Sequence, residues 1–185
     1  TCTAERIFTP THTYIENTLE SFAAAIDFGA EMIELDIHPT TDGEFVVFHD
    51  WTLDCRTDGK GPTRDQDLAT LKALDIGYGY TADGGATFPL RGKYVGGMPT
   101  LNEVLTEFPD IPFIINIKSR SEKEAQALLS YVPETEWARL SLSGHVTPLS
   151  VIREAKPDVV TLTRAQAKTC LKNYLCWVRN KRIFL

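Results

Sequence analysis

The sequence lacks the features that mark membrane-spanning and nucleic-acid-binding chains. No run approaches the roughly 20 apolar residues that a membrane helix requires. Positive charge is not concentrated: the 19 Lys and Arg are outnumbered by 25 Asp and Glu, the formal net charge is -6, and the densest basic stretch is the tail with Arg179, Lys181 and Arg182. We therefore expect a soluble chain with neither a nucleic-acid-binding nor an anionic-membrane-binding surface.

The cysteines form no recognisable metal motif. Cys2, Cys55, Cys170 and Cys176 include no CxxC pair and no Cys/His cluster at zinc spacing, which argues against a thiolate metal site. Their pairing stays open. The chain begins with Thr1 and not with Met, which is compatible with a processed or trimmed amino terminus from which an export signal is missing. Localisation is therefore not predicted.

The composition is that of a globular domain. The 185 residues are 43% hydrophobic and 24% charged, enough to bury a sizeable core as one domain. Short apolar runs rich in β-branched residues alternate with amphipathic stretches, which is typical of a parallel sheet with helices outside it. Predicted strands cover 6–9, 32–38, 45–49, 113–117, 140–142 and 159–162. Predicted helices cover 65–74, 100–107, 121–131, 148–155, 164–177 and a first helix capped by Asn17 or Thr18 and ended by Gly29.

The stretch between about residues 54 and 95 interrupts this alternation. It is rich in Gly, Thr and Asp and contains one weak helix, so we interpret it as an insertion. Long structured loops of this kind usually carry function or cap a site. Without it, the chain provides about six strand–helix units.

Polar residues alternate along the strand at 32–38. Glu34, Asp36 and His38 share one face, because successive side chains of a strand point to opposite sides. Two carboxylates at this spacing stand about 7 Å apart, close enough to grip one hard cation. A buried carboxylate is costly unless it is paired or bound to a metal. From spacing alone, a polar strand face that is simply wet is an equally good interpretation.

Other polar residues end two further strands. His49 is the last residue of the strand at 45–49, and Asn116 and Lys118 share a face at the end of the strand at 113–117. In parallel α/β folds, active sites are built at the carboxyl ends of strands. A single histidine in such a place is commonly incidental, but its coincidence with carboxylates and a lysine favours a functional His49. A plain structural domain with solvated strand ends remains the competing interpretation.

Short motifs, in order, resemble the glycerophosphodiester phosphodiesterase family. The match is ordered over residues 16–118, with a weaker echo at 157–177. The motifs are Glu16-Asn17-Thr18-Leu19-Glu20-Ser21-Phe22, Gly29-Ala30, Glu34-Leu35-Asp36, Thr41-Asp42-Gly43, Val46-Val47-Phe48-His49-Asp50, Thr52-Leu53-Asp54, Arg56-Thr57-Asp58-Gly59, Pro99-Thr100-Leu101, Glu103-Val104-Leu105 and Asn116-Ile117-Lys118. The resemblance implies a TIM-type (β/α) barrel in a single domain over 1–185. Since a full barrel takes about 250 residues, we expect it to be incomplete or trimmed at about six units.

The resemblance also implies metal-dependent hydrolysis of glycerophosphodiesters to glycerol 3-phosphate and an alcohol. Carried over by position, Glu34 and Asp36 are metal ligands, His49 is one of two catalytic histidines, and Lys118 neutralises phosphate charge. The metal is Ca²⁺ or Mg²⁺, as oxygen ligands prefer. Such a cation polarises the phosphoryl oxygens, and an imidazole can protonate the departing alkoxide near neutral pH.

The family's opening motif is missing. The family has His-Arg-Gly where this chain has Ile7, Phe8 and Thr9, and so lacks the other catalytic histidine and a phosphate-binding arginine. We hypothesise that His12, in the same loop, takes over the histidine's role; a surface loop residue is an equally good interpretation. A catalytically impaired barrel that binds a phosphodiester or metal without turnover is therefore the alternative function.

Three further expectations concern the metal, the substrate and the sheet edge. Asn116 stands where the family has its third carboxylate ligand, so the metal should bind more weakly. His38 and Trp51 are expected on the substrate side, although a tryptophan beside a strand end is more commonly a packing residue. Residues 180–185 do not continue the family pattern, and an open sheet edge is a liability that a homo-oligomer, a swapped copy or further residues would cover.

Overall fold

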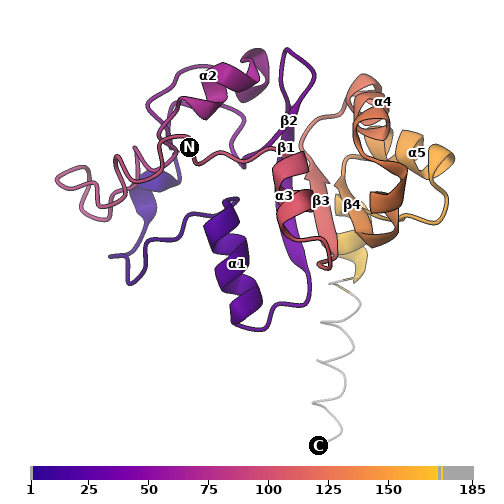
Figure 1. Cartoon of the computed structure of the whole chain (residues 1–185), viewed down its shortest axis with the longest axis horizontal. Coiled ribbons are helices and arrows are strands. Elements are labelled where there is room, and N and C mark those ends of the chain that lie inside the picture. Colours follow the sequence, from indigo (N-terminus) through magenta and orange to yellow (C-terminus); the bar gives the residue numbers. More distant parts are fainter. Residues whose placement is uncertain (1, 171, 173–185) are drawn as a thin grey trace, which may run out of the picture.

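A single five-stranded sheet organises the protein, for which a computed structural model describes residues 2–170 and 172. The strand order is β2-β1-β3-β4-β5, in which β1, β3, β4 and β5 are parallel and β2 pairs with β1 in the antiparallel direction. The strands are β1 (Ile33–Pro39), β2 (Phe45–Val47), β3 (Phe113–Ile117), β4 (Leu140–Gly144) and β5 (Val160–Thr163). The sheet is open, with β2 and β5 as its edges, and so forms an incomplete barrel (Figure 1).

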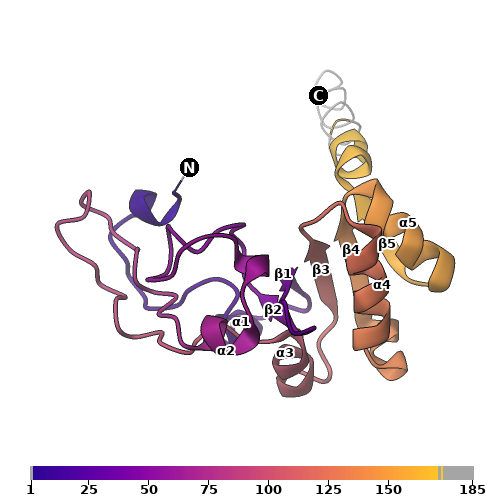
Figure 2. The same ribbon diagram turned by 90° about the horizontal axis from the view of Figure 1, so that it is seen from above.

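Helices surround the sheet, as the alternating pattern predicts. The longer ones are α1 (Leu19–Asp27), α3 (Leu101–Glu107), α4 (Glu122–Tyr131) and α5 (Val146–Ala155). Both views place α4 and α5 beside β4, while α2 (Leu68–Lys72) lies on the other side of the molecule (Figures 1 and 2). Residues 164–170 and 172 are helical. The rest of the helix predicted to extend to 177 lies outside the described residues.

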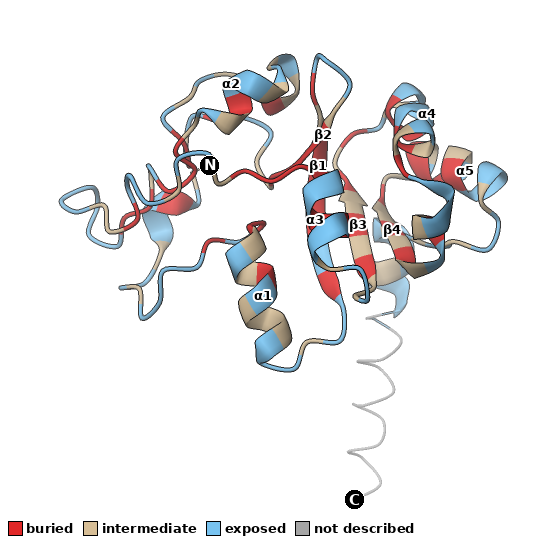
Figure 3. Ribbon diagram, in the orientation of Figure 1, coloured by how far each residue is buried: buried red, intermediate tan, exposed pale blue. Residues whose placement is uncertain are grey.

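The main core lies between the sheet and these helices. Ile33, Leu35 and Ile37 of β1 are buried in it, which confirms the predicted apolar face of this strand. Phe113 and the other alternate residues of β3 join them, and the buried segments follow the strands in Figure 3. Each such side chain stabilises the fold by about 1.5–3 kcal/mol relative to an exposed one. The apolar face therefore fixes which side of β1 carries its polar residues.

Thr18, and not Asn17, is the N-cap of the first helix, α1. The Thr18 side chain accepts a hydrogen bond from the Ser21 amide, and the Ser21 side chain accepts one from the Thr18 amide. Asn17 instead adopts a positive φ of 61°, a conformation in which Asn is enriched. Gly29 follows the helix with φ of 93° and so acts as its predicted terminator.

The predicted strand at 6–9 is wrong. The structure has a short 3-10 helix, η1 (Ala4–Arg6), followed by irregular backbone, and the Phe8 side chain is 94% exposed. The position beside β1 that a first strand would take is occupied by β2. The amino-terminal segment instead packs Ala4 into a small cluster with Ile15 and Tyr80.

Two other predicted elements are shorter than expected. The strand at 45–49 ends at Val47 and returns antiparallel, because the turn through Asp42 is too short for a crossover. The helix predicted at 65–74 is divided into η2 (Thr63–Asp65) and α2. No helix in the described part of the chain combines the length and apolar character needed to cross a membrane.

The excursion between β2 and α3 has cores of its own. One cluster contains Val46, Phe48, Leu53, Leu71, Ile76 and Met98, and a second contains Ala4, Ile15, Tyr80 and Leu90. A disulfide between Cys2 and Cys55 ties the amino-terminal segment to this excursion. Gly79 packs directly against the backbone of Cys55, since a Cβ atom at position 79 would lie 1.8 Å from the Cys55 carbonyl oxygen. The excursion is thus a packed structure and not a loose loop.

Candidate active site

The pairing of β1 with β3 brings three predicted site residues together. Asp36 and Asn116 are register partners, and Lys118 follows β3 directly. Asp36 Oδ1 accepts a hydrogen bond from Asn116 Nδ2 at 3.0 Å and lies 2.7 Å from Lys118 Nζ. The Asp36 and Lys118 side chains are only 6% and 7% exposed. The result is a buried ion pair at the carboxyl end of β3.

Asn17 completes the surroundings of the same carboxylate and escaped the sequence analysis. Its Nδ2 donates to Asp36 Oδ2 at 3.3 Å, and its Oδ1 accepts from the Asp36 amide at 3.1 Å. The positive φ of Asn17 is part of the turn that carries this side chain. Two signals were available, its position directly before the helix cap Thr18 and its place in the first matched motif, but neither assigned it a contact with Asp36.

Glu34 lies beside this pair on the polar face of β1. It has no hydrogen-bond or ion-pair partner among the described residues and is exposed to solvent at its tip. Partial burial, and then the charge of Asp36, raise the pKa of the Glu34 carboxyl above its ordinary value. Lys118 and His49 act on this pKa in the opposite direction. Glu34, Asp36, Lys118 and His49 are therefore within electrostatic reach of one another.

The oxygen donors here match a hard cation in their chemistry. Glu34 is unpartnered in the described part of the chain, and Asn116 uses only its Nδ2 toward Asp36, which leaves its carbonyl oxygen available. Hard oxygen donors of this kind suit Ca²⁺ or Mg²⁺. Across residues 2–170 and 172, however, no three His, Cys, Asp or Glu side chains converge as a metal-binding group. In their chemistry alone, two carboxylates and an amide are donors that a hard cation accepts.

His49 reaches the site from the hairpin. The Phe48 amide donates to the Asp36 carbonyl oxygen at 2.9 Å, which fixes the chain just after β2. His49 Nδ1 lies 2.7 Å from Asp50 Oδ1, and the imidazole is 45% exposed. Because a carboxylate only accepts, the hydrogen bond to Asp50 places a proton on Nδ1 and leaves Nε2 free of this contact. His49, Asp50, Trp51 and Lys118 line one cavity of about 510 Å³.

His12 lies elsewhere. It is exposed, stacks on Tyr14 with ring centroids 5.5 Å apart, and lines two cavities between the amino-terminal segment and the excursion. Neither of these cavities is lined by His49 or Lys118. The structure therefore does not bring His12 into the cavity that the other catalytic candidates share.

His38 is wholly enclosed beneath Trp51. Its exposed fraction is 0%, and its Nδ1 lies 3.3 Å from Nη2 of Arg64. Burial, and then the Arg64 charge, lower the pKa of His38 to about 4. Trp51 is half-exposed, packs edge-on against His38, and carries the Arg64 guanidinium 4.4 Å from its ring centroid. Trp51 thus lines the cavity while His38 supports it from below.

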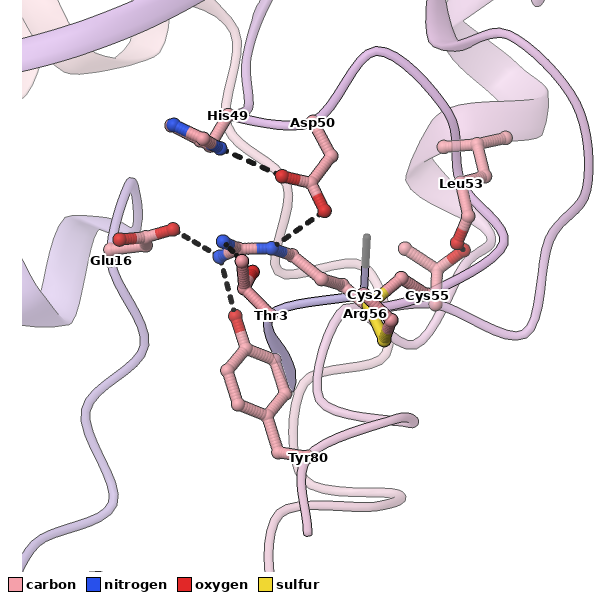
Figure 4. The surroundings of a disulfide bond; sticks show 10 residues. Cys2, Thr3, Glu16, His49, Asp50, Leu53, Cys55, Arg56 and Tyr80 are labelled. Carbon is pink, nitrogen blue, oxygen red and sulfur yellow. Dashed lines mark hydrogen bonds and ion pairs between the residues drawn. A yellow bond between two sulfur atoms is a disulfide. The ribbon is translucent and has the colours of Figure 1, made fainter. Parts of the chain in front are cut away.

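Arg56 is a second residue that the sequence analysis missed. Its buried guanidinium lies behind Asp50, with Nε 2.9 Å from Asp50 Oδ2 (Figure 4). Glu16, Tyr80 and Thr3 also contact it. The signal was present, because Arg56 opens one of the matched motifs, but its partners are scattered along the sequence.

Comparison with known proteins identifies a single family. Residues 10–178 match the glycerophosphoryl diester phosphodiesterase family. A glycerophosphodiester phosphodiesterase of Caldanaerobacter subterraneus subsp. tengcongensis is 38% identical over 107 residues, 57% of this chain and 40% of the relative. One of Bacillus subtilis is 39% identical over 112 residues, 56% of this chain and 37% of the relative. The chain thus spans about two-fifths of the length of these relatives.

The fold is also shared with a solved structure. The glycerophosphoryl diester phosphodiesterase domain of a Mycobacterium tuberculosis protein superposes with a TM-score of 0.69 and 21% identity. The match covers 88% of this chain and 60% of that one. At this level of identity, the likeness concerns the fold.

Proposed function

Because the chain belongs to the glycerophosphoryl diester phosphodiesterase family, we propose that it hydrolyses glycerophosphodiesters to glycerol 3-phosphate and an alcohol. The observation that carries the proposal is the buried pair of Lys118 and Asp36 beside Glu34, with His49 lining the same cavity as Lys118. A phosphodiester carries one negative charge, and Lys118 supplies the matching positive charge at the wall of that cavity.

A divalent cation completes this proposal. Glu34, Asp36 and Asn116 would hold Ca²⁺ or Mg²⁺ through their oxygens. When bound, the cation supplies Lewis-acid polarisation of a phosphoryl oxygen. Lys118 would then be shared between Asp36 and the phosphate, since its ammonium group has three donors.

His49 is the proposed general acid. Its Nδ1 proton is committed to Asp50, so that Nε2 is the nitrogen that exchanges a proton with the substrate. A protonated Nε2 can deliver its proton to the departing alkoxide oxygen and so prevent a high-energy anion from leaving. Trp51 lines the same cavity and would border the alcohol portion of the substrate. His38, below Trp51, would hold this wall in place.

A second candidate function rests on the amino-terminal segment. Phe8 is exposed at the position of the absent His-Arg-Gly motif, and His12 lines different cavities from His49. A site with one acid–base histidine would bind the phosphodiester or the cation and turn it over slowly or not at all. In the first function, we propose that His12 supplies the second histidine on substrate binding.

Two proposals concern the assembly. We propose that residues 1–185 act as one domain in which about 54–95 form an insertion that borders the site. The exposed side chains of Val160 and Leu162 on the edge strand β5 support a cover by a second copy of the chain or by further residues. The substrate is a small molecule, and no nucleic-acid partner is expected.

One assay separates the candidate functions. The protein is incubated with glycerophosphocholine and Ca²⁺ or Mg²⁺, with and without chelator, and glycerol 3-phosphate is measured. Cation-dependent release that is lost in His49→Ala supports the phosphodiesterase. Tight binding of glycerophosphocholine without release supports the impaired barrel, and neither binding nor release would refute both. If His12→Ala keeps full turnover while His49→Ala has none, the proposed role of His12 is excluded.

A further inference from the structure

Arg56 is the meeting point of four separate segments. Its Nε donates to Asp50 Oδ2 at 2.9 Å, its Nη1 donates to Tyr80 Oη at 2.9 Å, and its Nη2 donates to Thr3 Oγ1 at 2.8 Å. Nη1 also forms an ion pair with Glu16. Figure 4 shows the four partners arranged around one guanidinium. The Arg56 side chain is only 8% exposed, whereas that of its partner Glu16 is 53% exposed.

This arrangement commits Arg56 to the protein interior. A guanidinium has five N–H donors in a rigid plane, and here all three nitrogens are engaged. Burial alone would lower the pKa of the guanidinium, but its neighbours, led by Tyr80 and Glu16, raise it above its ordinary value. Arg56 is therefore a fixed cation whose three nitrogens all have protein partners.

Asp50 connects this cation to the proposed general acid. Its Oδ2 accepts from Arg56 and its Oδ1 accepts from His49 Nδ1 at 2.7 Å, so that one carboxylate is held from both sides. A carboxylate fixed by a guanidinium cannot rotate away from the imidazole without losing a charge-assisted hydrogen bond. The tautomer of a histidine is set by the hydrogen bond that its other nitrogen makes.

We propose that Arg56 is a positioning residue that acts through Asp50 to hold His49 in the tautomer with the proton on Nδ1 and Nε2 open to the cavity. The inference deepens the proposed function, because the orientation of His49 matters for turnover only if His49 is the general acid. The tautomer itself is a property of the protein and can be measured whether or not turnover occurs.

The disulfide explains how Arg56 is held in turn. Cys55 precedes Arg56 and Cys2 precedes Thr3, so the Cys2–Cys55 bond fixes the backbone on both sides of the hydrogen bond between Arg56 and Thr3. Gly79 lies against the Cys55 carbonyl, and its amide donates a hydrogen bond to the Arg56 carbonyl oxygen at 3.2 Å. The guanidinium is therefore placed by covalent and packing restraints and not by its ion pairs alone.

The test is nitrogen NMR of the histidine side chains. The chain contains only four histidines, so each imidazole can be assigned by single substitution in ¹⁵N-histidine-labelled protein. At a pH at which the His49 imidazole is neutral in each variant, we expect the wild-type protein to show Nδ1–H as the major tautomer. In Arg56→Gln, we expect loss of Nδ1–H as the major form. Asp50→Ala should give the same loss, and the double variant should lose no more than either single one.

Arg91→Gln is the matched control. Arg91 belongs to the same excursion and also stacks on aromatic rings, with its guanidinium carbon 3.9 Å from the Tyr78 ring centroid, but it does not contact Asp50. This variant should keep the wild-type His49 tautomer. The signal of the enclosed His38 reports in every variant whether the fold is intact. If Arg56→Gln proves unfolded by this criterion, Arg56→Lys takes its place, with the same loss expected because Lys lacks the planar fork.

The decisive contrary result is a folded Arg56 variant that keeps the wild-type tautomer while Asp50→Ala changes it. Turnover gives a separate measurement. With an active enzyme, Arg56→Gln should lower kcat by about 10- to 100-fold with little change in KM, the size typical of residues that orient a functional group from behind. If the wild-type protein shows no turnover, the proposed function fails, and the NMR comparison still decides the role of Arg56.

Discussion

The ammonium group of Lys118 lies 2.7 Å from a carboxylate oxygen of Asp36, and neither side chain is more than 7% exposed. A buried ion pair of this kind contributes little net stability relative to an apolar pair, because both charges lose their hydration. Removal of one partner is costly, however, since the remaining charge stays buried without compensation. The site therefore depends on a positive charge near Asp36, from Lys118 or from a bound cation.

Lys118→Met should lower the free energy of unfolding by about 3–5 kcal/mol when measured by urea denaturation in the presence of chelator. Lys60→Met is the control, because Lys60 is 78% exposed and its ion pair with Asp54 is long, at 3.8 Å. This variant should change the free energy of unfolding by less than about 0.5 kcal/mol. Equal stabilities of the two variants would contradict the buried pair. Added Ca²⁺ or Mg²⁺ should restore part of the loss in Lys118→Met by compensating Asp36.

Asn116→Glu should tighten divalent-cation binding. The substitution adds a third carboxylate beside Glu34 and Asp36, and it removes the hydrogen bond from Asn116 to Asp36. We expect the dissociation constant for Ca²⁺ or Mg²⁺, measured by calorimetry, to fall by about tenfold, which corresponds to about 1.4 kcal/mol. Asn102→Glu, on the exposed surface of α3, adds the same charge away from the site and should leave the dissociation constant unchanged. Equal or weaker affinity in Asn116→Glu would place residue 116 outside the set of ligands.

Strand faces were predictable from the sequence because their period is local. Alternation along β1 correctly separated Ile33 and Leu35 from Asp36, and the strand-end positions correctly brought Asn116 and Lys118 to Asp36. The competing interpretation was a solvated strand face. It does not hold at Asp36, which is buried, but it does hold at Glu34, which is exposed.

The contacts that the sequence did not reveal are those made by loops. Asn17 reaches Asp36 only because a positive φ turns the chain before α1, and Arg56 gathers Thr3, Glu16 and Tyr80 from segments far apart. No periodicity marks such positions. The strand expected at 6–9 failed for a related reason: its apolar run suited a strand, but the place beside β1 was already taken by the hairpin.

Acid should destabilise the protein through His38. Its pKa is lowered from an ordinary value of 6.5 to about 4, so the unfolded chain binds a proton between these values and the folded chain does not. The contribution of neutral His38 to the free energy of unfolding is complete above pH 6.5. It is lost as the pH falls toward 4, which lowers the free energy of unfolding by about 3 kcal/mol. Between these limits, in chelator, wild-type stability should fall more steeply than that of His38→Leu. His12→Gln, an exposed histidine, should follow the wild-type curve, and parallel curves for all three would contradict this assignment.

Reduction of the disulfide should destabilise the fold. Cys2 and Cys55 are separated by 53 positions, and a cross-link that closes a loop of this length restricts the unfolded chain by about 4 kcal/mol. Cys2→Ser should therefore lower the free energy of unfolding by about that amount, and added reductant should have the same effect on the wild type. Cys170→Ser, at an exposed cysteine with no disulfide partner among residues 2–170 and 172, should be neutral. A Cys2→Ser protein as stable as the oxidised wild type would contradict the expected restriction of the unfolded chain by this bond.

The hairpin of β1 and β2 has a consequence for the order in which the site is assembled during folding. Asp36 and His49 are neighbours along the chain, joined by a short turn and by the Phe48 amide, so their meeting requires only local contacts. Lys118 arrives with β3, after the whole excursion has been closed as a loop, and such distant contacts form late because loop closure costs entropy. A nascent chain that has only its hairpin therefore holds the carboxylates and the histidine without the lysine. We therefore expect Asn116 and Lys118, which both come with β3, to join the site after the hairpin residues.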